Sequence, residues 1–403
     1  MIRWVILVVI VLFIDFYAFQ SVKTITKNKI IFLIYWLLSI AILSNFIYKL
    51  ATFNRSDGLS QTVMLAFGIL VLSIVPKVVS LLILVGEDLF RVVKLGVNYF
   101  SNSSSPTYFP GRREFVSKVA LGLAAIPFAS VLYGMARGKY NYQVLKHTLY
   151  FEDLPAAFDG FKLTHISDIH SGSFDDASKI AHGMDLINEQ ESDVILFTGD
   201  IVNNKAEEMD PWISHFKSLK AAYGKYSVLG NHDYGEYVRF NSAEEKEQNF
   251  QAIKDIHPKI GFNLLLNESI YLEKEGEKIA IIGVENWGTR FKKAGDLNLA
   301  SSKITKEDFK VLLSHDPSHW DKEVKNHQKN YQLTLSGHTH GMQFGIEIPG
   351  IKWSPVQYIY KQWAGIYKEF NSYINVNRGF GFLAFPGRVG IWPEITVITL
   401  KKK

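Results

Sequence analysis

The sequence predicts an α/β domain that follows a membrane region of about four helices. Two observations lead to this prediction. Residues 1–135 are rich in Val, Leu, Ile and Phe, whereas residues 140–403 have a mixed composition. The second part also alternates short apolar runs with amphipathic stretches, which is typical of an α/β fold. We therefore divide the chain into a membrane region, 1–139, with a basic linker at 86–114, and a globular domain, 140–403.

The membrane region contains four apolar stretches that are long enough to cross a bilayer, which takes roughly 20 residues. They cover about residues 4–20, 30–50, 60–85 and 115–135. Pro76-Lys77 interrupts the third stretch. This stretch is therefore either a kinked span or a span that ends near Pro76 and continues as an interfacial helix. Asp15 lies within the first stretch, near enough to its end that we expect the carboxylate to reach the interface. The polar run Asn102–Ser105 is expected to be a linker.

The charges of the loops predict an orientation. The two loops that join spans one to two and three to four, with their flanks, are basic: Lys23, Lys27, Lys29, Arg91, Lys94, Arg112, Arg113 and Lys118. The opposite side holds only Arg3, Lys49 and Arg55. By the positive-inside rule the basic loops are cytoplasmic, and residues 140–403 then lie on the non-cytoplasmic side. Arg112-Arg113 either resembles a twin-arginine export signal placed inside the chain or simply supplies positive-inside charge, and both interpretations give this orientation.

Composition excludes several kinds of site. The chain has no Cys, so disulfides, thiolate nucleophiles and Cys-ligated zinc are excluded, and any metal must be bound through nitrogen and oxygen. The net charge is +5, and no basic cluster with interleaved aromatic residues occurs, which argues against nucleic-acid binding. No protein partner is predicted.

Five apolar runs of the globular domain end in polar side chains. They lead into Asp168-Ile169-His170, Gly199-Asp200, Gly230-Asn231-His232-Asp233, His315-Asp316 and Gly337-His338-Thr339-His340. Taken singly, each has an ordinary interpretation as a turn, a helix N-cap or an Asx turn. Together they favour one site, because α/β proteins place their sites at the carboxyl ends of strands. Alternate residues of an extended segment point to opposite sides, so His338 and His340 could each bind one of two neighbouring metal ions.

In this order, the motifs D-x-H, G-D, G-N-H-D, H and G-H-x-H resemble the signature of calcineurin-like metallophosphoesterases. The match covers about residues 145–403, and the segment Pro393–Thr396 resembles the end of the bacterial membrane-anchored branch. The resemblance implies a four-layer α-β-β-α sandwich and a metal-dependent phosphoric ester hydrolase. It also implies two divalent ions that activate a water molecule; nitrogen and oxygen ligands suit Mn, Fe, Zn or Co.

The resemblance implies seven metal ligands. The first ion would be held by Asp168, His170 and His340, the second by Asn231, His315 and His338, and both by Asp200.

Further roles follow from the same resemblance. His232 would contact the substrate and protonate the leaving oxygen. Asp233 would orient His232, unless it caps a turn. Arg378 and Arg388 are weaker candidates for holding a phosphate, since either could be a solvated surface arginine.

The expected function is that of a membrane-anchored phosphoesterase acting on a monoester or diester, with a lipid or cell-envelope substrate. We expect an integral protein of the bacterial inner membrane. One alternative is a pyrophosphatase similar to the UDP-2,3-diacylglucosamine hydrolases of lipid A synthesis, whose substrate lies on the cytoplasmic side. Another is a membrane scaffold with an inactive domain, against which the intact set of ligands argues.

Overall fold

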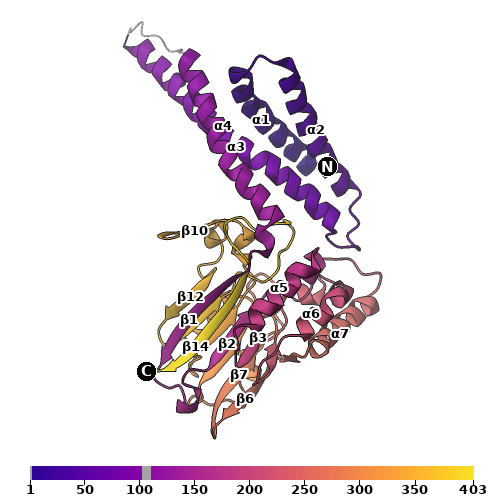
Figure 1. Cartoon of the computed structure of the whole chain (residues 1–403), viewed down its shortest axis with the longest axis vertical. Coiled ribbons are helices and arrows are strands. Elements are labelled where there is room, and N and C mark those ends of the chain that lie inside the picture. The colour runs from indigo at the N-terminus through magenta and orange to yellow at the C-terminus, as the bar shows by residue number, and fades with distance from the viewer. Residues whose placement is uncertain (1, 102–109) are drawn as a thin grey trace. The chain divides into compact units, whose positions relative to one another are not determined.

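The chain forms two compact units in a computed structural model that describes residues 2–101 and 110–403 (Figure 1). The membrane unit comprises the residues up to Phe53 and Thr62–Ala136, and the sandwich unit comprises Asn54–Gln61 and Arg137–Lys403. The expected linker Asn102–Ser105 lies outside the described residues.

Within the described residues, four helices of the membrane unit are long and apolar enough to cross a membrane. They are α1 (Ile2–Ile25), α2 (Lys29–Ala51), α3 (Gln61–Phe100) and α4 (Pro110–Ala136). Helix α3 continues through Pro76, so an interfacial helix after this residue would be continuous with the span. Its 40 residues extend roughly 60 Å at 1.5 Å each, about twice the thickness of a bilayer core. Much of the segment 86–114, expected as a linker, is therefore helical.

Asp15 is buried rather than directed to the interface, and this expectation was wrong. Its carboxylate lies 2.5 Å from Nζ of Lys77, which joins α1 to α3. The Lys77 ammonium also donates hydrogen bonds to Ser39 and Ser73, both at 2.8 Å. The pair thereby satisfies two charges that would be costly alone in an apolar environment.

Arg112 and Arg113, the twin arginines of the sequence, both have partners at the start of α4. Arg113 forms ion pairs with Glu87 and Asp88 of α3. The guanidinium of Arg112 lies over the ring of Phe90, 4.1 Å from its centroid. Both side chains therefore help to pair α3 with α4.

The described part of the sandwich unit contains two six-stranded sheets. In spatial order the first is β1 (Gln143–Phe151), β14 (Glu394–Lys402), β2 (Lys162–Ile166), β3 (Val194–Phe197), β4 (Lys225–Ser227) and β5 (Asn263–Leu264). The second is β12 (Gly365–Glu369), β13 (Ser372–Val376), β9 (Leu333–Ser336), β8 (Lys310–Leu313), β7 (Glu277–Gly283) and β6 (Glu268–Lys274). Strands β2 to β5 run parallel, as do β7, β8 and β9, so their carboxyl ends share an edge in each sheet.

The sheets pack face to face and helices cover their outer faces, which confirms the predicted four-layer α-β-β-α sandwich. Helices α5 (Ala177–Asn188), α6 (Ile213–Lys217) and α7 (Ala243–Lys259) cover the first sheet (Figure 1). The short α8 (Leu297–Ala300) and a π-helical turn at Trp320–Val324 cover the second. The core between the sheets includes Leu163, Leu196, Val228, Ile281, Val311 and Leu335.

The local sequence explains these elements. All four residues of β3, Val-Ile-Leu-Phe, are buried, as expected for a parallel strand covered on both faces. Helix α5 begins at Asp176, whose side chain accepts hydrogen bonds from the backbone N–H groups of Ser178 and Lys179. Its buried residues Ile180, Met184 and Ile187 form the apolar stripe that faces the sheet.

Candidate metal centre

Five chain segments at the carboxyl ends of strands bring the predicted ligands together. Asp168 and His170 follow β2, Asp200 follows β3, Asn231 follows β4, His315 follows β8, and His338 and His340 follow β9. The first three strands belong to one sheet and the last two to the other. The centre is therefore assembled where the carboxyl edges of both sheets meet.

The backbone at these positions is unusual. Five of the predicted ligands are non-glycine residues in the left-handed region: Asp168 (φ 53°), His170 (φ 48°), Asp200 (φ 61°), His338 (φ 72°) and His340 (φ 50°). Such a conformation costs about 1–3 kcal/mol per residue and tends to cluster at functional sites. The fold therefore holds these five residues in a backbone conformation that they would not adopt on their own.

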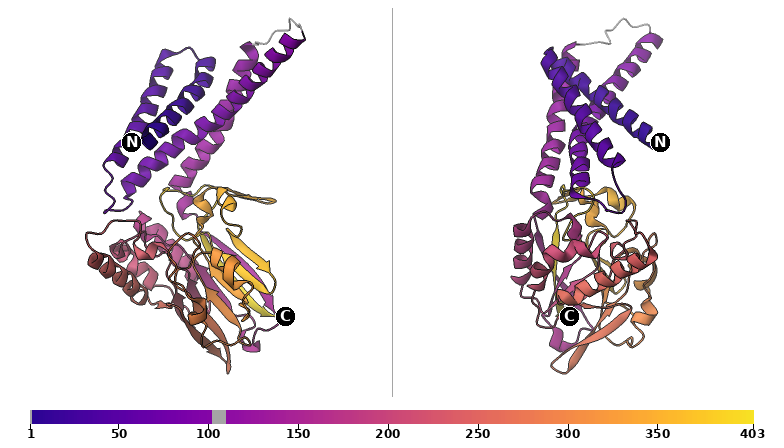
Figure 2. Two further views of the ribbon diagram at one scale, coloured as in Figure 1. Left: turned by 180° about the vertical axis from the view of Figure 1, so that it is seen from behind. Right: turned by 90° about the vertical axis from the view of Figure 1, so that its right-hand side faces the viewer.

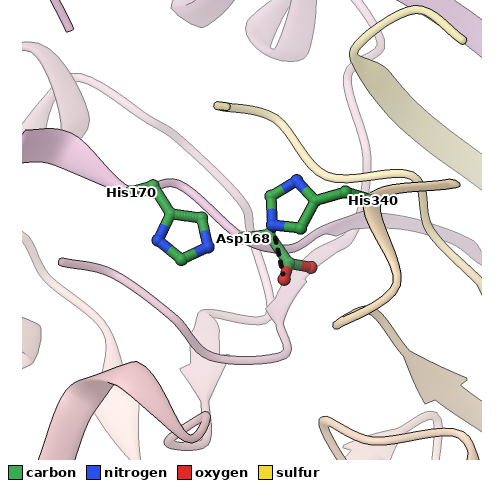
Figure 3. Close-up of side chains that lie close together, drawn as sticks. All are labelled: Asp168, His170 and His340. Carbon is green, nitrogen blue, oxygen red and sulfur yellow. Dashed lines mark ion pairs between the residues drawn. The ribbon is translucent and has the colours of Figure 1, made fainter. Parts of the chain in front are cut away.

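One group of possible ligands consists of Asp168, His170 and His340, which point toward one another in Figure 3. One ligand atom from each lies within 4.8 Å of the others. His340 Nε2 is 3.3 Å from Asp168 Oδ1. Within the described residues, both ring nitrogens of the fully buried His170 lack a hydrogen-bond partner, as does His340 Nε2. Buried polar atoms are rarely left unpaired, so these nitrogens fit a cation.

A second group consists of Asp200, His315 and His338. His315 Nε2 lies 3.1 Å from Asp200 Oδ2 and 3.2 Å from His338 Nδ1. Asp200 Oδ2 is also 3.6 Å from His170 Nε2, so this carboxylate lies between the two groups. Burial would raise the pKa of Asp200, but the surrounding histidines lower it below its usual range.

Asn231 adds a neutral oxygen beside the second group. Its amide nitrogen donates a hydrogen bond to the Tyr237 hydroxyl at 2.7 Å. Its buried Oδ1 finds no partner among the residues that the structure describes. The contact with Tyr237 therefore fixes which end of the amide is free to bind a metal.

Neighbouring groups also decide which nitrogen of His315 and which nitrogen of His338 is free. The Nδ1–H of His315 donates to the carbonyl oxygen of Thr198 at 2.7 Å, which leaves Nε2 for a metal. His338 Nε2 lies 2.8 Å from the Tyr360 hydroxyl, which leaves Nδ1 on the side of His315. The donor set of nitrogen and carboxylate or amide oxygen suits Mn, Fe, Zn or Co.

His232 lies at the edge of this centre. Its ring packs 4.9 Å from that of His170 and stacks on Tyr237, with centroids 4.3 Å apart. Its Nδ1 is 2.7 Å from the carbonyl oxygen of Asn203, so that Nε2 remains for another partner. Its backbone N–H donates to Asp200 Oδ1 at 2.8 Å, which links the two residues.

Asp233 does not orient His232, and this expectation is corrected. Its buried carboxylate instead accepts hydrogen bonds from the backbone N–H groups of Asp200, Ile201 and Gly230, at 2.8–2.9 Å. Burial and the charge of Asp200 raise the pKa of Asp233 to about 7. The alternative interpretation, a carboxylate that fixes a turn, describes its contacts better.

Arg378 and Arg388 are not positioned to hold a phosphate, and the expectation that they are substrate-binding residues is corrected. Arg378 is 4% exposed and forms ion pairs with Glu347 and Glu394. Arg388 is fully buried and donates to the carbonyl oxygens of Gly381 and Arg378. Because their N–H groups are already engaged inside the protein, neither arginine is free to hold a phosphate, and Arg388 Nη2 also lies 3.2 Å from Nδ1 of the proposed ligand His340.

Two tyrosines near the centre were not among the predicted site residues. Tyr237 follows Asn231 by six residues, and Tyr360 follows His338 by 22. Neither lies in a motif, and only the tertiary structure brings their hydroxyl groups to the ligands. Asp316 also approaches His338, with Oδ2 3.7 Å from Nε2, while its other oxygen accepts from the backbone of Ser318.

Comparisons with known proteins match both parts of the chain to calcineurin-like phosphoesterases. Residues 2–139 match the family described as "Probable Calcineurin-like phosphoesterase, transmembrane domain", and residues 161–342 match "Calcineurin-like phosphoesterase". The uncharacterized metallophosphoesterase YkuE of Bacillus subtilis is 31% identical over 304 residues, which cover 72% of this chain and 97% of that protein.

Two further relatives are more distant. The phosphodiesterase YaeI of Escherichia coli is 25% identical, with 72% of this chain and 98% of that protein covered. A transmembrane protein with metallophosphoesterase domain from Danio rerio is also 25% identical, with 67% of this chain and 60% of that protein covered.

Proposed function

Because the chain belongs to the calcineurin-like metallophosphoesterases, we propose that this hydrolase uses two divalent metal ions at the centre described above. Membership in the family implies divalent metals and a phosphoester substrate. The observation that carries the proposal is the pair of ligand groups with Asp200 between them and with unpaired buried nitrogens directed inward.

The residues fit this assignment. Asp168, His170 and His340 would hold the first ion, and Asn231, His315 and His338 the second, with Asp200 shared. When bound, such ions supply Lewis acidity and an activated water for in-line displacement at phosphorus.

The chain's own residues would then orient the reaction. His232 is held at Nδ1 by the Asn203 carbonyl, which leaves Nε2 available to donate a proton to the leaving oxygen. The stacked ring of Tyr237 limits the movement of that imidazole. Asp233 would act indirectly, since it fixes the backbone of Asp200 and Gly230.

We further propose a lipid or cell-envelope phosphoester as the substrate and a non-cytoplasmic location for the sandwich unit. The four apolar helices support the first part, because a single span would be enough to anchor a soluble enzyme. The basic loops support the second part. The name of the relative YaeI favours a phosphodiester. A lipid A pyrophosphatase would need the opposite orientation, and an inactive scaffold would not need the complete set of ligands.

The activity can be tested with the full chain in detergent. Mn²⁺, Zn²⁺ and Mg²⁺ would be titrated against bis-p-nitrophenyl phosphate and p-nitrophenyl phosphate. Asp200→Asn should abolish turnover, and His232→Ala should lower kcat by about 10²–10⁴-fold, as expected for loss of a general acid. His182→Ala, an exposed histidine on α5, is the matched control and should match the wild type. Metal-dependent turnover that survives Asp200→Asn would refute the assignment.

The orientation has a separate test, because the chain has no native Cys. Single cysteines at Leu299 and Lys27, both exposed, would be treated in intact cells with a maleimide that does not cross membranes. The proposal expects labelling at position 299 and none at position 27. The reverse pattern would favour the pyrophosphatase alternative.

A further inference from the structure

We propose that the hairpin formed by β10 (Ile346–Ile348) and β11 (Ile351–Trp353) inserts its apolar face into the lipid bilayer beside the metal centre. The hairpin forms a two-stranded sheet of its own and joins neither of the large sheets. Figure 2 shows it extending from the rim of the sandwich unit. The inference does not depend on which phosphoester is hydrolysed.

The hairpin presents its apolar side chains outward. Ile346 pairs with Trp353 and Ile348 with Ile351 across the two strands, so all four side chains share one face. The three isoleucines are 49%, 56% and 52% exposed. Soluble surfaces rarely present such a continuous apolar face without a partner.

The opposite face of the hairpin is attached to the protein by charged groups. Glu347 and Lys352 form the remaining cross-strand pair and therefore point away from the isoleucines. Glu347 forms an ion pair with Arg378, and Lys352 donates to the carbonyl oxygen of Ala364 at 2.6 Å. The hairpin is thus amphipathic, but its polar face is directed toward the protein and its apolar face is directed outward, the opposite of the arrangement in a soluble protein.

The position of the hairpin in the chain identifies the bilayer as the occupant. At its base, the N–H of Gly345 donates to the carbonyl oxygen of Val389. Residues Arg388 and Trp392, on either side of Val389, lie against Gly138. A Cβ added to Gly138 would be 2.5 Å from the Arg388 carbonyl oxygen and 2.6 Å from the Trp392 ring. Gly138 is two residues beyond Ala136, the end of α4, or roughly 7 Å of extended chain. The base of the hairpin is therefore close to the point where the chain leaves a membrane helix.

The same hairpin is connected to the metal centre. Ser354, which follows β11, donates from Oγ to the carbonyl oxygen of Gly341 at 2.8 Å. Gly341 is adjacent to His340, one of the proposed ligands. Met342, the next residue, is a further exposed apolar side chain of this segment, at 48%. A lipid held against the hairpin would therefore have its headgroup near the metal ligands.

A second copy of the chain is a less suitable occupant. A stable protein–protein interface buries roughly 800 Å² on each partner, which is more than four side chains on a narrow hairpin can supply. Interfacial anchoring needs less, because a few aliphatic and aromatic side chains add to the binding of a chain that already spans the membrane.

Depth-dependent fluorescence quenching tests the proposal in the full chain. Since the chain has no native Cys, Ile348→Cys would be labelled with an environment-sensitive fluorophore and reconstituted in vesicles of phosphatidylethanolamine and phosphatidylglycerol containing doxyl lipids. The negative control is Tyr150→Cys, an exposed site on β1 seven residues from Gln143, roughly 23 Å along the strand. The positive control is Leu37→Cys, an exposed site within α2.

Because interfacial segments insert about 5–10 Å, the label at position 348 should be quenched at least about twofold more than the label at position 150, mainly by shallow doxyl groups. The label at position 37 should respond to deeper groups. Equal quenching at positions 348 and 150 would overturn the proposal. Emission at position 348 that shifts to the blue with protein concentration, without lipid quenching, would also overturn it in favour of a second copy.

Discussion

Tyr237 offers a sharp test of how the second ligand group is oriented. Its hydroxyl accepts a hydrogen bond from Asn231 Nδ2 at 2.7 Å, and its ring stacks on His232 at 4.3 Å. Tyr237→Phe removes the first contact and keeps the second. The Asn231 amide would then lose the partner that directs its oxygen inward, whereas the position of His232 would be preserved.

The expected size of the effect follows from the lost contact. A hydrogen bond contributes about 0.5–1.5 kcal/mol net, and a loss of 1 kcal/mol corresponds to about fivefold in affinity. Removing groups that orient metal ligands typically weakens binding by about 10–100-fold. We therefore expect the second ion to bind about 5–30-fold more weakly in Tyr237→Phe. The first ion should bind as in the wild type, because none of its proposed ligands contacts this hydroxyl among the described residues.

Calorimetric titration of Mn²⁺ into the metal-free full chain would resolve the two affinities. Tyr271→Phe is a matched control, since it removes a hydroxyl that donates to Asp308 at 3.0 Å on the edge strand β6. The reasoning is refuted if both affinities of Tyr237→Phe stay within twofold of the wild type. It is also refuted if Tyr271→Phe weakens Mn²⁺ binding as much as Tyr237→Phe does.

Three further predictions concern stability. Gly337→Ala would place Cβ 1.9 Å from Ser167 Oγ and 2.1 Å from Asp168 Oδ2, so it should lower the free energy of unfolding by about 1–3 kcal/mol and weaken metal binding, as urea denaturation with and without Mn²⁺ would measure. Arg388→Met should lower the free energy of unfolding by about 3 kcal/mol in the same assay, because it leaves buried carbonyl oxygens unpaired. Unchanged stability together with a raised KM would instead indicate that Arg388 binds the phosphate. Lys77→Met should lower the thermal stability in detergent by the equivalent of about 3–5 kcal/mol, and adding Asp15→Asn should recover most of the loss; equal losses in both would contradict a specific ion pair.

The sequence was most informative where function is encoded by side-chain type at strand ends. Asp168, Asp200 and His315 stand directly after apolar runs, and a parallel sheet brings such positions to one edge. The four spans were equally visible, because about 20 apolar residues suffice to signal each one. In both cases the information is local to a short segment.

The errors arose where contacts join distant segments. Arg378 and Glu347 are 31 residues apart, and no local pattern indicates that they pair. The same is true of the carboxylate of Asp15 and the ammonium of Lys77, on different helices. Helix α3 continues through Pro76, in agreement with the expected kinked span, and in a membrane neighbouring groups can compensate for the missing N–H.

The left-handed backbone conformation of five ligands could not be predicted from the sequence either. This conformation leads to a last prediction. Five strained residues and several unpaired buried atoms make the metal-free centre unfavourable. A metal that binds only the folded state adds stability, about 2.7 kcal/mol per site at a concentration 100 times the dissociation constant. Thermal unfolding of the full chain should therefore shift strongly upward when Mn²⁺ replaces EDTA.

The variant Asp200→Asn separates this effect from nonspecific binding of cations. Because Asp200 lies between both ligand groups, its replacement should remove most of the shift that Mn²⁺ causes. Asp185→Asn, which alters an exposed carboxylate on α5, should retain the full shift. If Mn²⁺ raises the unfolding temperature of both variants equally, the stabilisation arises elsewhere, and the strain at the strand ends is not relieved by metal binding.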